Sequence, residues 1–211
     1  MHSRRGRRTF FDNLSESWKS GARLEKLGEN CRLLELSAGD ICLDMGCGHG
    51  VCSAILAEMV SPGGRVISVD YSMKMLLAGR ENGLCDFGTP LCGACESLPL
   101  RDSSIDAAVA FQCLPHFSDK KTAVDELFRV LRPGARAMVL HFDSSDGINR
   151  MHRRIKGPVS RDHLPKAGEL ANLSSSIGFR VVEALERDDL YRVLIKKPPA
   201  EKFLARTPLK S

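Results

Sequence analysis

The stretch Leu43-Asp44-Met45-Gly46-Cys47-Gly48-His49-Gly50 decides the fold, because an apolar run passes directly into a glycine-rich turn. The apolar run over Ile41–Met45 predicts a buried strand, and helical spacing resumes over Val51–Val60. Glycine has no Cβ, so a loop of this kind lets the backbone approach a bound molecule closely. A glycine loop alone is weak evidence, since many strand–helix turns carry glycine for geometry.

Two aspartates flank the glycine loop at positions that suit a bound nucleoside. Asp44 stands two residues before Gly46, and Asp70 ends the next expected strand, over residues 65–70. A carboxylate at a strand end can accept hydrogen bonds from both hydroxyls of a ribose. The alternative, a capping Asp44 and a turn Asp70, requires several features to coincide by chance. The combination favours a nucleoside-binding site.

The alternation of strand and helix patterns continues along the chain. Further strands are expected over residues 105–111, 137–142, 181–185 and 190–195, and helices over residues 10–36, 72–82, from 118 or 119 to the Pro133-Gly134 pair, and 166–177. Near-continuous apolar strands that alternate with helices indicate a parallel sheet covered on both faces. We therefore predict a doubly wound α/β fold, with the ligand beyond the carboxyl ends of the strands.

The net charge of +5 comes from the two ends of the chain. Four arginines precede residue 9, and residues 196–211 hold five basic residues and one Glu, so residues 9–195 carry a net charge of −3. A nucleic-acid-binding protein would be expected to spread positive charge over a folded face. Basic chain ends more often serve solubility, so we expect no nucleic-acid partner.

Composition and cysteine use indicate a single cytoplasmic domain. The 211 residues are 43% hydrophobic, and no stretch approaches the roughly 20 apolar residues of a membrane-spanning helix. The pair Arg7-Arg8 resembles a twin-arginine export signal, but polar residues follow where an apolar segment should stand. We expect free thiols at the eight cysteines and no membrane insertion. Cys92-x-x-Cys95 lacks a second ligand pair, so no metal site is expected.

The sequence resembles the class I S-adenosylmethionine-dependent methyltransferases, in particular the ubiquinone/menaquinone-biosynthesis C-methyltransferase branch. Besides the glycine loop, the resemblance is carried by residues 11–18, Val69-Asp70-Tyr71-Ser72, residues 96–106 and residues 128–134, and it covers residues 10–197. It implies a mostly parallel seven-stranded sheet with helices on both faces and an antiparallel last strand. It also implies S-adenosylmethionine as cofactor, S-adenosylhomocysteine as product and a small-molecule acceptor. The branch methylates many kinds of molecule, so the resemblance does not specify the acceptor.

The resemblance implies a role for each matching position. The cofactor-binding residues would be Asp44, Gly46, Cys47, Gly48, Asp70, Tyr71, Ala94, Cys95 and Gln112. Asp44 would lie near the methionine amino group, Asp70 would hold the ribose, and Tyr71 would pack on the adenine face. Gln112, after the strand at 105–111, would contact the methionine moiety.

One position departs from the family pattern. An Asp or Asn that contacts the adenine edge usually stands where this chain has Ala94, whose side chain cannot make that contact. The backbone N–H of Cys95 can still donate a hydrogen bond to the ring. The departure predicts a weaker affinity, or a reliance on other groups.

Methyl transfer needs little catalytic machinery, because the sulfonium already activates the methyl group and the protein mainly aligns the nucleophile. A general base is optional and depends on the pKa of the acceptor. Four histidines lie in segments expected at the mouth of the site: His116, His141, His152 and His163. We take His116 and His152 as candidate catalytic residues. The alternatives are polar or capping histidines, or several histidines that bind a metal.

We expect one domain over residues 10–197, between a basic N-terminus at 1–9 and a basic tail at 198–211. Within this domain a polar insertion at 143–165 is expected to form a lid over the site, capped by Ser144 or Ser145. On its helix Ile148, His152 and Ile155 share one face, which should turn inward. Its arginines at 150, 153 and 154 either attract an anionic acceptor or form a solvated face.

Other functions stay open at this point. An RNA or protein methyltransferase is disfavoured, because the Asn/Asp-Pro-Pro-aromatic motif and the Pro-Cys dipeptide are missing. A nicotinamide-dependent oxidoreductase would carry G-x-G-x-x-G, whereas this loop reads G-x-G-x-G. Only a turnover assay would exclude a non-catalytic cofactor-binding module. The sequence does not predict the oligomeric state.

Overall fold

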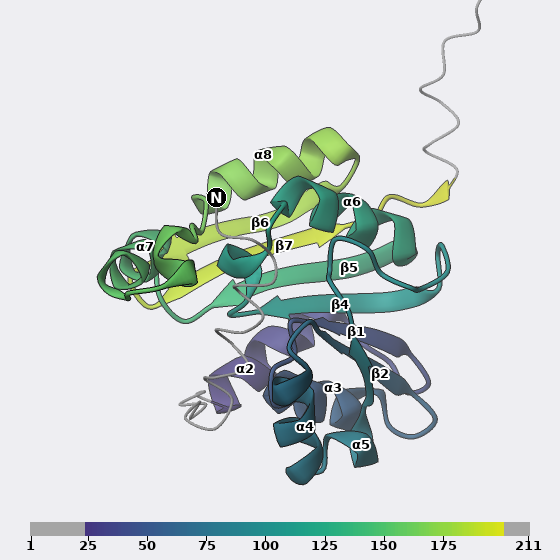
Figure 1. Ribbon diagram of the computed structural model, residues 1–211. Coiled ribbons are helices and arrows are strands. Elements are labelled where there is room, and N and C mark those ends of the chain that lie inside the picture. The colour runs from purple at the N-terminus through teal and green to yellow at the C-terminus, as the bar shows by residue number, and fades with distance from the viewer. Residues whose placement is uncertain (1–23, 201–211) are drawn as a thin grey trace, which may run out of the picture.

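The apolar run before the glycine loop forms β1 (Ile41–Met45), a central strand of the sheet in the computed structural model, which describes residues 24–200. On one side β1 pairs in parallel with β2 (Arg65–Asp70), and on the other with β4 (Ile105–Phe111). The sheet has seven strands in the order β3-β2-β1-β4-β5-β7-β6 (Figure 1).

The outer strands complete the predicted topology. At one edge β3 (Thr89–Cys92) pairs in parallel with β2, and beyond β4 lies the parallel β5 (Leu131–His141). The last two strands, β6 (Arg180–Arg187) and β7 (Leu190–Lys196), form a hairpin in which β7 is antiparallel to both β5 and β6. The mostly parallel seven-stranded sheet with an antiparallel last strand is therefore confirmed.

Helical segments connect the strands: α2 (Leu24–Cys31), η1 (Arg32–Leu34), α3 (Val51–Val60), α4 (Met73–Glu81), α5 (Leu84–Phe87), η2 (Leu114–His116), α6 (Lys120–Val130), α7 (Ser145–Arg154), η3 (Pro158–Arg161) and α8 (Ala167–Ile177). Successive strand side chains point to opposite faces of the sheet. Cys42 and Val109 join a core with α2 and α3, whereas Leu43 and Ala108 join a second core with α6 and α8. Helices thus cover both faces, as the strand pattern predicts (Figure 1).

Local capping explains where the helices begin. The side chains of Ser72, Asp119 and Ser144 each accept a hydrogen bond from the backbone N–H three residues further on, at 3.2, 3.0 and 3.2 Å. Such N-caps satisfy amide groups that the first helical turn leaves without partners. The three starts agree with the sequence prediction.

The ends of two helices differ from the prediction. We expected α6 to end at Pro133-Gly134, but it ends at Val130 and β5 begins at once. The reason is pairing: Leu131 lies opposite Ile105, and the Gly134 N–H donates to the carbonyl of Lys197, directly after β7, at 2.9 Å. The helix expected over 10–36 ends at Cys31 and continues as the turn η1, and its part before residue 24 lies outside the described residues.

Among residues 24–200, the helices are too short or too polar to cross a lipid bilayer.

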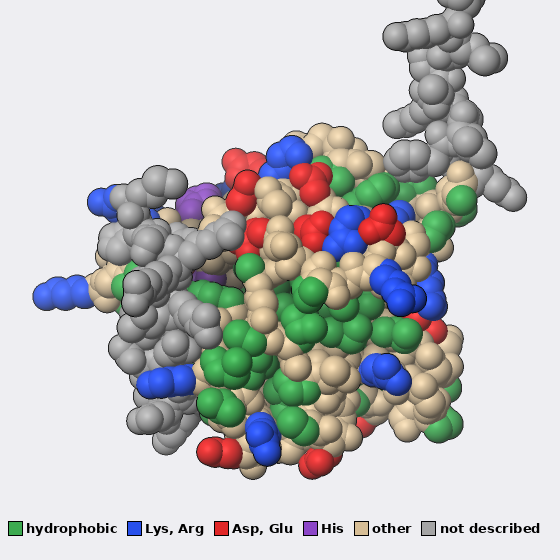
Figure 2. Space-filling model, turned by 45° about the vertical axis from the view of Figure 1, so that its right-hand side comes forward, with side chains coloured by type: hydrophobic (Ala, Val, Ile, Leu, Met, Phe, Trp, Pro, Cys, Tyr) green, Lys and Arg blue, Asp and Glu red, His purple; other side chains and the backbone are tan. Residues whose placement is uncertain are grey.

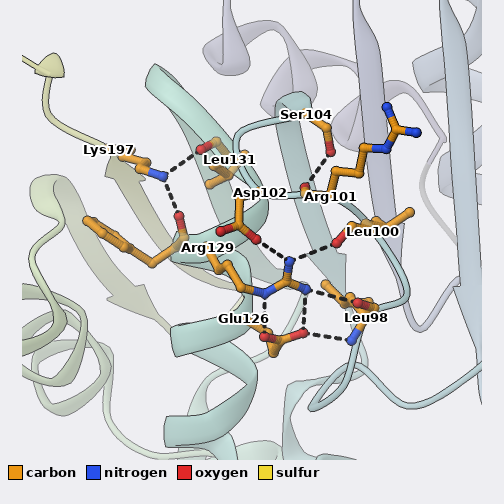
Figure 3. A network of polar contacts seen from close by, with 10 residues as sticks. Leu98, Leu100, Arg101, Asp102, Ser104, Glu126, Arg129, Leu131 and Lys197 are labelled. Atoms are coloured by element: carbon orange, nitrogen blue, oxygen red, sulfur yellow. Dashed lines mark hydrogen bonds and ion pairs between the residues drawn. The ribbon is translucent and has the colours of Figure 1, made fainter.

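The loop between β3 and β4 is fixed to α6 by the guanidinium of Arg129 (Figure 3). Arg129 donates to both carboxylate oxygens of Glu126, at 2.7 and 2.8 Å, and to Asp102 at 2.7 Å. It also reaches the carbonyls of Leu98 and Leu100, at 2.9 and 2.7 Å. These hydrogen bonds hold the pKa of Glu126 below its ordinary value. The network anchors the stretch that follows residues 94 and 95.

We predict that Arg129→Lys lowers the free energy of unfolding by about 2 kcal/mol, because an ammonium cannot serve these acceptors at once. Urea unfolding of parent and variant measures the change. Lys121→Ala, which removes an exposed ion pair with Asp125 on the same helix, is the matched control and should change stability by about 0.5 kcal/mol or less. Equal losses in the two variants would contradict the anchoring role.

Candidate functional site

The glycine loop turns sharply where β1 ends. The backbone N–H groups of Gly46 and Cys47 both donate to the carbonyl of Val69 on β2, at 2.7 and 3.0 Å. Gly46 and Gly48 have φ values of +69° and +54°, in the left-handed region that favours glycine. The turn therefore binds the carboxyl end of β1 to that of β2.

The two glycines face different surroundings. A Cβ on Gly46 would lie 2.6 Å from the Cβ of Cys113, so Gly46 permits close packing inside the protein. A Cβ on Gly48 would meet no atom of residues 24–200 within 4 Å, so its free side faces open space within this part of the chain. Of the two, only Gly48 leaves room for a ligand against the loop.

Asp44, in β1, is buried and only half satisfied. Ser53 of α3 donates to its Oδ2 at 2.6 Å, and the hydroxyl of Ser68 lies 2.7 Å from that of Ser53. Its Oδ1 has no hydrogen-bond partner among residues 24–200. Burial, and secondarily the charge of Asp70, raise its pKa from 3.8 to about 7. A buried carboxylate oxygen without a partner favours a cationic or hydrogen-bond-donating ligand.

Asp70 closes the other side of the loop. Its Oδ2 accepts from the Gly48 N–H at 2.9 Å, and its Oδ1 accepts from the Ser72 N–H at 2.8 Å. Burial raises its pKa, while these two hydrogen bonds act in the opposite direction. Each oxygen retains a second lone pair, so the carboxylate can still accept hydrogen bonds from a ligand.

The other predicted cofactor residues lie along the same edge of the sheet. Half-buried Tyr71, directly after β2, packs with Met75, Ile155 and Val159. Ala94 and the buried Cys95 follow β3, and Gln112 follows β4 with its side chain exposed and a φ of +52°. Cys47 is buried in the loop, and burial raises the pKa of its thiol.

Segment 143–165 buries two of the three residues that its spacing predicts on one helix face, whereas half-buried Ile155 lies just after the end of α7. Ile148 and His152 are buried on α7, while the arginines at 150, 153 and 154 are exposed. The amide of Asn149 donates to the Leu164 carbonyl at 2.9 Å, and its oxygen accepts from the Leu164 N–H at 2.8 Å. This pair of hydrogen bonds fixes the end of the segment against its own helix.

Two candidate histidines meet around Asp162. The Nδ1 atom of His116 lies 2.8 Å from Asp162 Oδ2, and that of His152 lies 3.0 Å from the Asp162 carbonyl oxygen. The two ring centroids are 5.1 Å apart. Burial, followed by the charge of His116, lowers the pKa of His152.

The other two histidines differ from each other. His141 is buried at the end of β5, and burial together with the charges of His116 and His152 lowers its pKa to about 3. His163 is exposed. In the part of the chain that the structure describes, no three His, Cys, Asp or Glu side chains are placed to hold a metal ion.

Asp162 is the residue of this cluster that sequence reasoning missed. It stands between an Arg and an exposed His in a polar segment, and it is 46 residues from His116. Spacing rules describe neighbours on one helix or strand, so they cannot detect a pair that forms only when two loops meet.

We predict that Asp44→Asn stabilises the ligand-free protein above neutral pH. The pKa of Asp44 is higher in the folded state, about 7, than its ordinary value of 3.8, so this group makes stability fall as pH rises between about 4 and 7. Asn cannot ionise and removes that fall. Urea unfolding should show similar stabilities near pH 4 and a gain of about 2 kcal/mol or more for the variant near pH 8.

The control is Asp125→Asn, which neutralises an exposed carboxylate on α6 and should leave the pH profile close to that of the parent. If the free energy of unfolding falls as steeply in Asp44→Asn as in the parent between about pH 4 and 7, ionisation of Asp44 is not the cause of that fall.

Comparisons with known proteins agree with this geometry. Residues 43–139 match a family model described as a methyltransferase domain. The chain is 41% identical over 170 residues to an uncharacterized 37.1 kDa protein in transposon TN4556 of Streptomyces fradiae, covering 75% of this chain and 49% of that protein. It is 35% identical over 136 residues to a ubiquinone/menaquinone biosynthesis C-methyltransferase of Vibrio campbellii, covering 63% and 52%.

The chain thus spans about half the length of these curated relatives. Among solved structures, a SAM-dependent methyltransferase from Aquifex aeolicus superposes with a TM-score of 0.71 at 22% identity, over 88% of this chain and 97% of that one. That likeness establishes the fold. The matched family model and the Vibrio campbellii relative support the interpretation of residues 43–139 as a class I S-adenosylmethionine-dependent methyltransferase domain.

Proposed function

We propose that this protein binds S-adenosylmethionine at the carboxyl ends of β1 and β2 and transfers its methyl group to a small-molecule acceptor. The observation that carries the proposal is the buried Asp44 Oδ1, which has no partner among residues 24–200, beside a glycine loop whose Gly48 faces open space. When bound, the cofactor supplies a methyl group on a positively charged sulfur.

The residues present fit this cofactor. Asp44 would accept a hydrogen bond from the ammonium of its methionine part, whose positive charge would favour the ionised carboxylate. Asp70 would accept from the ribose hydroxyls with its remaining lone pairs. Tyr71 would contact the adenine, and the Cys95 N–H would donate to the adenine edge in place of a side chain at Ala94.

Fold and charge argue against the other functions. A nicotinamide-binding doubly wound sheet runs 3-2-1-4-5-6, whereas here the antiparallel β7 stands between β5 and β6. On the face drawn in Figure 2, Lys and Arg side chains are interspersed with Asp and Glu, and the described residues there form no continuous basic band. A broad nucleic-acid interface would require such a band.

We propose one catalytic domain over residues 10–197, in which segment 143–165 acts as the lid. Its helix α7 turns Ile148 and His152 inward, and its Ile155 and Val159 pack with Tyr71. A lid so placed would exclude water from the transfer and select the acceptor by shape. The eight cysteines, all free thiols, suit action in the reducing cytoplasm.

We predict that Asp70→Ala weakens S-adenosylmethionine binding by about 2 kcal/mol or more, because it removes a charged acceptor from two hydroxyls at once. Ala94→Asp should leave the affinity unchanged or improve it. Isothermal titration calorimetry of parent and variants measures both effects, with circular dichroism as the check on folding. Asp189→Ala, at an exposed turn, is the control and should bind like the parent. No heat and no thermal shift for the parent at millimolar cofactor would overturn the proposed function.

We also predict that alanine at Gly46 mainly lowers stability, whereas alanine at Gly48 mainly lowers cofactor affinity. Gly46→Ala should lower stability more than Gly48→Ala does, because its Cβ meets that of Cys113 at 2.6 Å. Gly48→Ala should cost about 1 kcal/mol of backbone strain but reduce cofactor affinity at least tenfold, since its Cβ fills ligand space. Thermal unfolding and titration calorimetry on both variants separate the two effects. A Gly48→Ala variant that binds as tightly as the parent would place the cofactor elsewhere.

A further inference from the structure

Asp162 and His116 come from separate parts of the fold and meet in a buried pair. Asp162 follows η3 in segment 143–165, whereas His116 ends η2, directly after β4. The Asp162 side chain is fully buried and that of His116 is 15% exposed, with 2.8 Å between Oδ2 and Nδ1. Because both side chains are largely withdrawn from water, this hydrogen bond meets little competition from solvent.

The contacts fix which nitrogen of each ring faces away from Asp162. The Asp162 carbonyl oxygen can only accept a hydrogen bond, so the Nδ1 atom of His152 is the donor, and the Nδ1 atom of His116 would donate in the same way to the Asp162 carboxylate. In each neutral ring the lone pair is then on Nε2. Asp162 therefore orients two imidazoles at once, one through its carboxylate and the other through its backbone.

His116 lies at the carboxyl edge of the sheet, because η2 follows the end of β4, and β4 pairs in parallel with β1. A positive charge on His116 lowers the pKa of Asp70, which ends β2 at the same edge. The same charge lowers the pKa values of His141 and His152. A proton on His116 is balanced by Asp162 and disfavours a second proton on either neighbouring ring.

We propose that His116, positioned by Asp162, is the general base that removes the proton from a weakly acidic hydroxyl of the acceptor. This inference rests on the proposed methyl transfer and narrows its acceptor to phenols and similarly acidic hydroxyl compounds. A phenol, with a pKa of about 10, is mostly protonated near neutral pH and is a poor nucleophile until a base removes its proton. An acceptor already ionised at neutral pH would not need a base.

The proposed step balances. The hydroxyl O–H bond breaks as its proton moves to His116 Nε2, and the oxygen electron pair forms the new bond to the methyl carbon. The electron pair of the broken C–S bond stays on sulfur. The products are a methyl ether, S-adenosylhomocysteine and an imidazolium balanced by Asp162, which then releases its proton to water. No oxidant or reductant is needed.

The acidity of the acceptor distinguishes two roles for His116: a general base, or a structural contact (a latch) that only holds segment 143–165 in place. The probes are 4-methylphenol, mostly protonated at about pH 8, and 4-nitrophenol, largely ionised there. His116→Ala and Asp162→Asn should lower kcat for 4-methylphenol about 100-fold or more and for 4-nitrophenol less than about tenfold. A latch would lower both rates by the same factor, and that outcome would overturn the proposal.

Matched controls test position and chemistry. Asp125→Asn makes the same change on an exposed carboxylate of α6, outside segment 143–165, and should keep the parent rates. Added imidazole should restore turnover of 4-methylphenol by His116→Ala, and no rescue would argue against a base. His116→Gln provides a second variant of similar size if the alanine variant unfolds.

Titration calorimetry with S-adenosylmethionine separates this inference from the proposed function. Parent, His116→Ala and Asp162→Asn should bind the cofactor with affinities equal within about threefold, since neither residue is assigned to cofactor binding. A parent that binds no cofactor would overturn the proposed function. A parent that binds the cofactor but methylates neither phenol would overturn the hydroxyl acceptor alone.

Discussion

The shared carbonyl of Val69 is the constraint on which the site depends. Because it accepts from both Gly46 and Cys47, the chain must turn at the end of β1 instead of continuing as strand. The turn brings the Gly48 N–H to Asp70 and leaves the free side of Gly48 without a neighbour from residues 24–200. The carboxyl ends of parallel strands lie at one edge of the sheet. The position of this turn therefore determines how closely a ligand can approach the ends of β1 and β2.

The two buried carboxylates beside this turn destabilise the ligand-free protein, and a bound ligand would reduce that destabilisation. Two buried carboxylates, Asp44 and Asp70, raise each other's free energy when both are ionised, and Asp44 Oδ1 has no partner among residues 24–200. Such a site is less stable alone than an apolar one of the same shape, and a cationic ligand supplies the missing partner. The rest of the fold offsets the cost through two apolar cores and the Arg129 network.

The sequence predicted the features that depend on neighbouring residues. Helix starts at Ser72, Asp119 and Ser144 follow from single side chains, and the buried strands follow from apolar runs. Strand β3 was not located, because its four residues are half-exposed and include a proline. The contact of Asp162 with His116 could not be predicted, since it depends on how segment 143–165 packs against the loop after β4. Long-range loop packing has no sequence period to detect.

The same packing links cofactor and acceptor chemistry. Segment 143–165 contacts Tyr71 through Ile155 and Val159, and it delivers Asp162 to His116. A movement that withdrew this segment would therefore expose Tyr71, the proposed adenine contact, and would at the same time separate the proposed base from its carboxylate. The base would be assembled only when the site is closed to water, where an imidazolium–carboxylate pair is strongest. In this proposal closure and proton removal depend on the same few contacts, because segment 143–165 supplies both the cover of the site and the carboxylate of Asp162.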